Sequence, residues 1–171
     1  KLLGYTPRSR RAAVAKINFT VNGYGTWNQD NGTDLDLTIP KGTEFSTQRE
    51  GFTETFTLLE ATTVSPLLST WTFTDLPITQ GKLVTRQYTF SSKSRERYYL
   101  YDLNVDTTTL KVELRAPSSV NFAPPYTEST NIVDIDGTSK VYFLEESREG
   151  FYEIKFGDGV TGIKPSNGDI I

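Results

Sequence analysis

The sequence contains no cysteine, no histidine and no methionine. Without cysteine, the chain forms no disulfide and offers no thiol nucleophile, which is compatible with a reducing cytosol. Without histidine, it lacks the commonest general base and the commonest metal ligand near neutral pH. Because no methionine is present to mark a start codon, we expect the sequence to be an internal piece of a longer protein.

An excess of positive charge and long hydrophobic runs are also missing. Lysine and arginine together number 18 against 21 aspartate and glutamate residues, so the formal net charge is -3. Such a chain has no general attraction for phosphate backbones or anionic lipids. No run approaches the roughly 18 apolar residues that a membrane span needs, and no signal peptide opens the chain. We therefore expect a soluble, globular protein without nucleic acid or membrane partners.

Alternation of apolar and polar residues dominates what remains. From Ala15 to Asn22, apolar side chains at every second position predict a half-buried strand. Similar patterns, rich in β-branched and aromatic residues, predict about ten strands in total. The predicted strands are 15–22, 35–39, 43–47, 52–58, 71–74, 82–90, 98–101, 110–115, 141–144 and 151–156. We expect the first two to pair with each other, antiparallel, across a long loop.

The fold predicted from these patterns is mainly β, with antiparallel sheets in a sandwich or a partly open barrel-like arrangement and long loops. At most one short helix is expected, within residues 1–14, where Thr6 could cap and Pro7 could occupy the first turn. Three prolines between residues 116 and 131 exclude a central strand and predict a surface excursion. No linker divides the chain, so residues 1–171 are expected to form one β-rich domain.

The C-terminal stretch is the most informative. The strands 141–144 and 151–156 flank a polar connection, which is typical of a hairpin. Turn residues then follow at high density: Gly157, Asp158, Gly159, Gly162, Pro165 and Gly168. The glycines resemble a dinucleotide-binding loop in spacing, but Pro165 and Gly168 exclude the helix that such a loop requires. We interpret them as structural turn residues, with Asp158 capping its own turn through backbone amides.

Catalytic and metal-binding patterns are weak. The acidic clusters at 30–36 and 134–136 lack the spacing of a 12-residue calcium loop, so solvated acids are the better interpretation, with a structural cation as the alternative. Glu145 and Glu146 are adjacent, which does not suit a pair of glycosidase carboxylates, and no histidine is present to activate a serine. We predict no catalytic residues, no cofactor, no metal and no small-molecule substrate.

Arginine and tyrosine gather in one segment. Arg95 and Arg97 precede three tyrosines between residues 98 and 101. This composition fits either a stacking platform for single-stranded nucleic acid or a protein interface, in which arginine and tyrosine are enriched. The acidic net charge favours the protein interface.

Five short segments carry a resemblance to a known family. The sequence Phe156-Gly157-Asp158-Gly159, with Gly162, Pro165 and Gly168, resembles the signature of the baseplate J-like proteins of contractile-tailed phages. Segments 3–13 and 39–45 are similar to the T4-like baseplate wedge proteins that form the inner ring, as are segments 80–84 and 104–112. Residues 46–79 match nothing in this pattern and are a possible variable insertion.

The resemblance implies a structural component of a phage tail baseplate wedge, not an enzyme, in the virion and assembled in the host bacterial cytoplasm. It implies contacts with other wedge proteins in a ring around the hub, and a homodimer of the full-length protein. The candidate contact residues are Trp27, Trp71, Arg95, Arg97, Phe122 and Tyr126. The alternative is a carbohydrate- or receptor-binding β module of a tail fibre or secreted protein, in which Trp27 and Trp71 stack on sugars.

Overall fold

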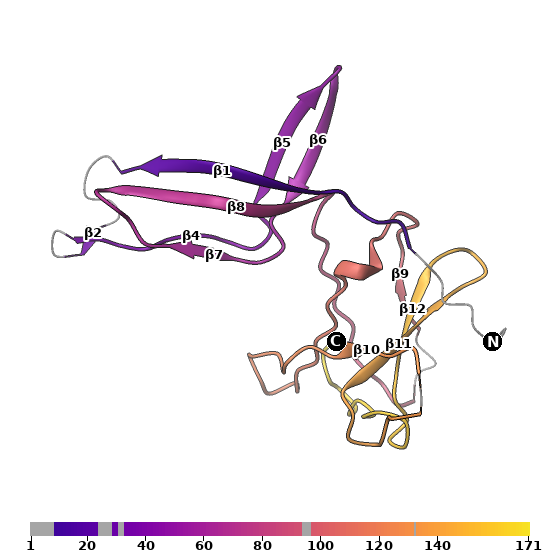
Figure 1. The fold of residues 1–171 in the computed structure, drawn as a ribbon. Helices are drawn as coiled ribbons and strands as arrows, with labels where there is room; N and C mark the ends of the chain where they lie inside the picture. The colour runs from indigo at the N-terminus through magenta and orange to yellow at the C-terminus, as the bar shows by residue number, and fades with distance from the viewer. Residues whose placement is uncertain (1–8, 24–28, 31–32, 94–96, 132) are drawn as a thin grey trace. The chain divides into compact units, whose positions relative to one another are not determined.

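The computed structural model describes residues 9–23, 29–30, 33–93, 97–131 and 133–171, and it is mainly β (Figure 1). The chain forms two compact units. One comprises residues 12–85, and the other comprises residues 86–171 together with the N-terminal segment up to Arg11. The sequence predicted one domain because no proline-rich or glycine-rich linker marks either crossing between the units.

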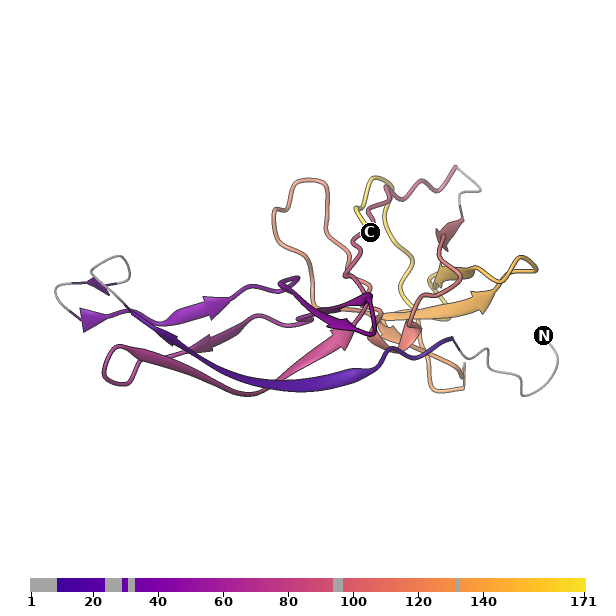
Figure 2. The ribbon, with the colours of Figure 1, turned by 90° about the horizontal axis from the view of Figure 1, so that it is seen from above.

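The 12–85 unit is built on a four-stranded antiparallel sheet of order β1-β8-β6-β5. Its strands are β1 (Val14–Asn22), β8 (Thr70–Gln80), β6 (Phe52–Thr57) and β5 (Glu44–Arg49). Two small antiparallel sheets complete the unit: β2 (Gln29–Asp30) with β3 (Thr33–Asp34), and β4 (Leu37–Ile39) with β7 (Thr62–Val64). In Figure 2, β1, in indigo, runs along the margin of its sheet.

The core of this unit is supplied mostly by β8. Trp71 and Phe73 are fully buried, and the Phe19 ring of β1 stacks on Phe73 with 4.9 Å between the ring centroids. Gly23 allows the close approach of Trp71, because a Cβ at this position would lie 2.7 Å from the indole. The apolar face that the sequence predicted for 15–22 is confirmed, since Ala15, Ile17, Phe19 and Val21 are the less exposed residues of β1.

A β-bulge interrupts the pairing of β1 with β8. Ile17 pairs with Leu76 and Phe19 with Phe73, so the two residues between them on β8, Thr74 and Asp75, oppose Asn18 alone. Asp75 adopts φ 53°, and its backbone amide donates to the Asn18 side chain at 2.6 Å. The extra residue is therefore accommodated by the inner strand, and β1 stays regular along its length.

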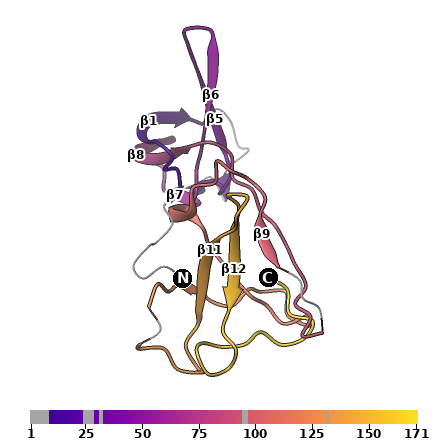
Figure 3. The same cartoon turned by 90° about the vertical axis from the view of Figure 1, so that its right-hand side faces the viewer.

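The 86–171 unit contains a second four-stranded sheet, of order β10-β11-β12-β9. Its strands are β9 (Tyr98–Leu100), β10 (Thr127–Glu128), β11 (Val141–Glu146) and β12 (Tyr152–Phe156), of which Figure 3 labels β9, β11 and β12. The predicted hairpin is confirmed as β11 and β12, which pair antiparallel, whereas β10 runs parallel to β11 at the edge. The 3-10 turn η1 (Thr107–Thr109) is the one helical element in the described residues.

Seven buried side chains form the core of the 86–171 unit, and half-buried aromatic rings surround them. They are Tyr98, Val112, Leu114, Tyr126, Tyr142, Ile154 and Ile171. Burial, followed by the nearby charge of Glu128, raises the pKa of Tyr142 to about 12. The C-terminal residues complete this core, because the backbones of Tyr88 and Ile171 exchange hydrogen bonds of 3.0 and 2.8 Å.

Several predicted elements are wrong in detail. Strands 15–22 and 35–39 do not pair with each other, because β1 pairs with β8 and β4 pairs with β7. Segments 82–90 and 110–115 make only isolated bridges, to Ile170 and Tyr126. Residues 9–13 hold no helix, and the rest of the predicted helix lies outside the described residues. No described helix is long and apolar enough to cross a bilayer.

Candidate protein-contact surfaces

The turn after β12 is built by backbone geometry. The Asp158 carboxylate accepts hydrogen bonds from the backbone amides of Val160 and Thr161, both at 2.9 Å, and from the Thr161 hydroxyl. These bonds, led by the Thr161 amide, lower the pKa of Asp158. Gly159 and Gly162 have φ values of +95° and +93°, a backbone conformation that residues with a Cβ rarely adopt. No helix follows within 157–171, so the chain offers no helix N-terminus to a pyrophosphate here.

A second turn with the same chemistry lies against the first. Asp136 accepts hydrogen bonds from the amide and hydroxyl of Thr138 and from the hydroxyl of Ser139, and the Thr138 hydroxyl contributes most to lowering the pKa of Asp136. The Gly162 amide donates to the Asp136 carbonyl at 2.9 Å, joining the two turns. The Asp136 carboxylate thus has hydrogen-bond partners, and no described group of three or more acidic residues could hold a metal ion.

The remaining turn residues anchor the tail. Pro165 is buried, and Gly168 has φ +92°. The Gly168 amide donates to the Phe90 carbonyl at 2.8 Å, and the Phe90 amide donates to the Asp169 carbonyl at 2.8 Å. The C-terminal stretch is therefore a scaffold held by main-chain hydrogen bonds.

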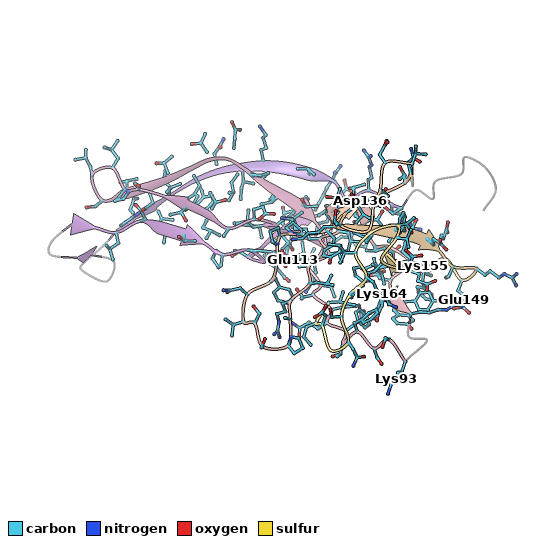
Figure 4. The ribbon with its side chains drawn as sticks, turned by 90° about the horizontal axis from the view of Figure 1, so that it is seen from below. Lys93, Glu113, Asp136, Glu149, Lys155 and Lys164 are labelled. Carbon is cyan, nitrogen blue, oxygen red and sulfur yellow. The ribbon has the colours of Figure 1, made fainter. Side chains whose placement is uncertain are left out.

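A charged and aromatic surface covers the outer face of β9, β11 and β12, and we call it the charged face. Glu145 and Glu153 lie directly opposite each other in the β11–β12 ladder, and Lys155 contacts both carboxylates, at 2.6 and 3.9 Å. Figure 4 shows Lys155 on this unit. Arg97 adds an ion pair of 3.8 Å with Glu153 and a hydrogen bond of 3.0 Å with the Tyr99 hydroxyl. The cations relieve the repulsion between opposed like charges.

Arg97 remains available at this face, because 64% of its side chain is exposed. An exposed ion pair contributes little to folding. Tyr101 extends the charged face, with its ring 5.6 Å from both Tyr99 and Phe151. More than half of Tyr101 is exposed. The face therefore contains arginine and tyrosine, two residue types that are enriched in protein interfaces.

Phe122 lies in the proline-rich loop, and its ring packs against the Arg115 side chain. The Arg115 guanidinium lies 5.3 Å from the centre of the Phe122 ring and donates to the Ser119 carbonyl at 2.7 Å. The ring stays partly exposed, at 39%. The loop thus presents an aromatic side chain whose position is fixed by a cation–π contact.

The structure contradicts two of the predicted contact residues. Trp71 is 1% exposed and donates its indole N–H to the Leu35 carbonyl at 2.9 Å, so it is a core residue. Tyr126 is 9% exposed, its ring lies edge-on to Phe156 at 5.7 Å, and burial raises its pKa. A stacked sugar could not reach Trp71. Trp27 and Arg95 lie outside the described residues.

Sequence reasoning missed the two-residue turn Leu68-Ser69 before β8, which the isolated bridge between Leu67 and Thr70 closes. Leu67 and Leu68 are 77% and 93% exposed, and Leu68 and Ser69 both adopt positive φ, at 50° and 57°. A two-residue turn of this kind normally contains asparagine and glycine. The available signal was the Leu-Leu pair between Pro66 and Ser69, which no strand pattern explained.

Comparison with known proteins gave two matches. Residues 82–171 match the family described as bacteriophage baseplate wedge protein gp6, third domain. The chain is also 23% identical over 168 residues to the baseplate wedge protein gp6 of Enterobacteria phage T4. That alignment covers 96% of this chain but only 23% of the T4 protein.

Proposed function

Because its family match extends over residues 82–171, more than half of the sequence, the chain belongs to the bacteriophage baseplate wedge protein gp6 family, and on this premise we propose that it is a structural part of a contractile tail's baseplate wedge. Its work is to contact other baseplate proteins, not to catalyse a reaction. The virion baseplate is accordingly its place of action, after assembly in the cytoplasm of the host bacterium.

The observation that carries this proposal is the agreement between the family match and the fold. The match begins at residue 82, and the larger segment of one compact unit begins at residue 86 and continues to the last residue of the match, whereas the N-terminal segment of that unit lies outside the match. A segment that is a family unit by sequence is thus also a packed unit with its own core. The match to the T4 protein supports the same role for the chain as a whole.

The more detailed parts of the proposal rest on the family resemblance of the glycine-rich signature at 156–168 and of the shorter segments described above. We place the protein among the baseplate J-like proteins of the inner ring, around the central hub. The full-length protein forms homodimers there, and the ring rearranges when the tail contracts. Residues 46–79, which supply β6, β7 and most of β5 and β8, are the variable part of the chain.

The contacts we assign to this role are Arg97 and Phe122, with Trp27 and Arg95 as further candidates. Arginine and aromatic side chains dominate binding energy when an interface excludes water around them. Arg97 is oriented by Tyr99, and Phe122 is oriented by Arg115, so each loses little side-chain freedom on binding.

Co-expression of the full-length protein with the other wedge proteins of the same phage tests this function. We expect a stable complex, and Arg97→Ala or Phe122→Ala should weaken it at least about tenfold if either is a hot spot. Phe52→Ala is the matched control, because Phe52 is 75% exposed at the β5–β6 tip and is not assigned a contact. Failure of the full-length protein to join any wedge complex would refute the proposal.

A further inference from the structure

The 12–85 unit contains two turns with the same backbone requirement, and the chain builds them from different residues. In the β5–β6 hairpin the two central residues are Glu50-Gly51, and in the turn before β8 they are Leu68-Ser69. All four have positive φ, at 51° and 85° in the first turn and at 50° and 57° in the second. Positive φ at both central positions is the requirement of a type I′ turn.

The Leu68-Ser69 turn is built from unfavourable residues. Glycine adopts positive φ without steric cost, so the Glu50-Gly51 turn follows the usual rule. Both residues of the second turn carry a Cβ, which makes left-handed backbone unfavourable. Leu68 is also 93% exposed and the adjacent Leu67 is 77% exposed. Neither folding nor solubility explains leucine here, because Asn-Gly would build the same turn. Backbone strain that a chain retains in this way is concentrated at functional sites.

The turn is held in place by the backbone around it. Leu67 and Thr70 exchange main-chain hydrogen bonds of 2.8 and 3.1 Å, and the Gly23 amide donates to the Ser69 carbonyl at 2.9 Å. Pro66 fixes the φ angle of the residue that precedes the turn. The two exposed leucines therefore stand on a constrained backbone and lose little main-chain freedom on binding.

The segments that form this end of the sheet carry no charge. No charged residue occurs in 61–74, and none occurs in 17–23, which ends beside the start of β8 (Figure 1). Nucleic acids and anionic lipids are bound through lysine and arginine, so the turn suits neither. Two neighbouring leucines without charge complement an uncharged apolar pocket from which water is excluded, and such pockets occur on proteins.

We propose that Leu67 and Leu68 form an anchor that inserts into an uncharged apolar pocket on another protein of the baseplate wedge. The inference deepens the proposed function and rests on it, because it names the side chains and the kind of pocket through which one wedge contact is made. An aliphatic side chain buried in a partner's pocket is a common centre of a protein interface. Asparagine or glycine at position 68 would relieve the backbone but would leave nothing to insert.

Replacing Leu68-Ser69 by Asn-Gly tests the anchor, because this change keeps the turn and removes the apolar side chain. We expect Tm to rise by at least about 4 °C, while the affinity of the full-length protein for the co-expressed wedge proteins of the same phage falls at least about tenfold. Leu67→Ser should also weaken the complex. A variant that gains stability and loses binding has not lost binding through misfolding.

Two matched variants complete the experiment. Leu68→Met keeps an apolar side chain on the same backbone and should bind as the wild type does. Phe52→Ala removes another exposed apolar side chain, beside the Glu50-Gly51 turn, and should leave the complex unchanged. Unchanged affinity in both the Asn-Gly variant and Leu67→Ser would overturn the anchor.

Two other occupants of the anchor would give different results. Sedimentation of the chain alone would reveal a second copy, as self-association that the Asn-Gly variant loses. Flotation with vesicles of phosphatidylcholine and phosphatidylglycerol would reveal a lipid surface, as binding that the same variant loses. Either result would overturn the assignment to a pocket on another protein.

The outcomes also separate this inference from the proposed function. A wedge complex that the wild type and the Asn-Gly variant form equally well would sink the anchor and leave the function standing. A wild-type protein that joins no wedge complex would refute the function, and the anchor would fall with it.

Discussion

Gly157 and Gly159 are two residues apart in the turn after β12, and the structure requires each for a different physical reason. At Gly157 the backbone is ordinary, but an added Cβ would lie 2.6 Å from the Gly162 Cα and closer still to its carbonyl group. Cβ atoms essentially never approach other atoms within 3.0 Å. At Gly159 no atom lies within 4 Å of an added Cβ, but φ is +95°.

The two alanine substitutions should therefore differ in cost. Gly159→Ala pays for the left-handed backbone alone, about 1 kcal/mol. Gly157→Ala drives a side chain into main chain that cannot rotate away, so we expect a cost at or above the upper end of the usual overpacking range of about 1–3 kcal/mol. For a unit of this size, each kcal/mol lowers Tm by roughly 4–8 °C. We expect losses of about 4–8 °C for Gly159→Ala and at least about 12 °C for Gly157→Ala.

Thermal unfolding followed by circular dichroism measures both variants. Equal losses for the two variants, or a smaller loss for Gly157→Ala, would show that the Gly157–Gly162 contact does not constrain the turn. Urea unfolding with an unchanged m-value would confirm that the native state, and not the denatured ensemble, is affected.

Three further predictions concern other parts of the chain. Replacing Leu68-Ser69 by Asn-Gly should stabilise the 12–85 unit by about 1–2 kcal/mol, because both residues adopt positive φ; a lower Tm would contradict this. Asp158 has a lowered pKa in the folded state, so its contribution is present above the ordinary aspartate pKa of about 4 and is lost as pH falls through the folded value. The stability difference between wild type and Asp158→Ala should accordingly shrink in acid, and a difference that grew would refute the assignment. Trp71→Phe should cost about 1–3 kcal/mol in urea unfolding through loss of the indole bond to the Leu35 carbonyl, and no loss would argue against its burial.

The sequence predicted those elements whose partners are close in the chain or whose alternation is unbroken. The β11–β12 hairpin was found because a short polar connection joins two apolar strands. The pattern of β1 was found because its face alternates without interruption. β8 was predicted only as 71–74, since the bulge at Thr74–Asp75 moves burial from odd to even positions and breaks the alternation.

The candidate contacts were harder to predict, because burial depends on distant segments. Trp71 packs against Gly23, which lies 48 positions earlier in the sequence. The residues next to Trp71 therefore do not show that its side chain is buried. Tyr126 is buried by strands on either side of it in the sequence. Arg97 was predicted as a contact residue from the local composition alone, whereas its ion pair with Glu153 depends on the β9–β12 register.

Ile171 completes the core of the 86–171 unit, and this has a consequence for how the chain folds during synthesis. Residues 12–85 are contiguous, so that unit can fold as soon as its last strand emerges from the ribosome. The other unit has high contact order, because Ser9 bonds to Thr107 and Ile171 bonds to Tyr88. Its core cannot form until Ile171 has been synthesised, so we expect this unit to fold second and more slowly.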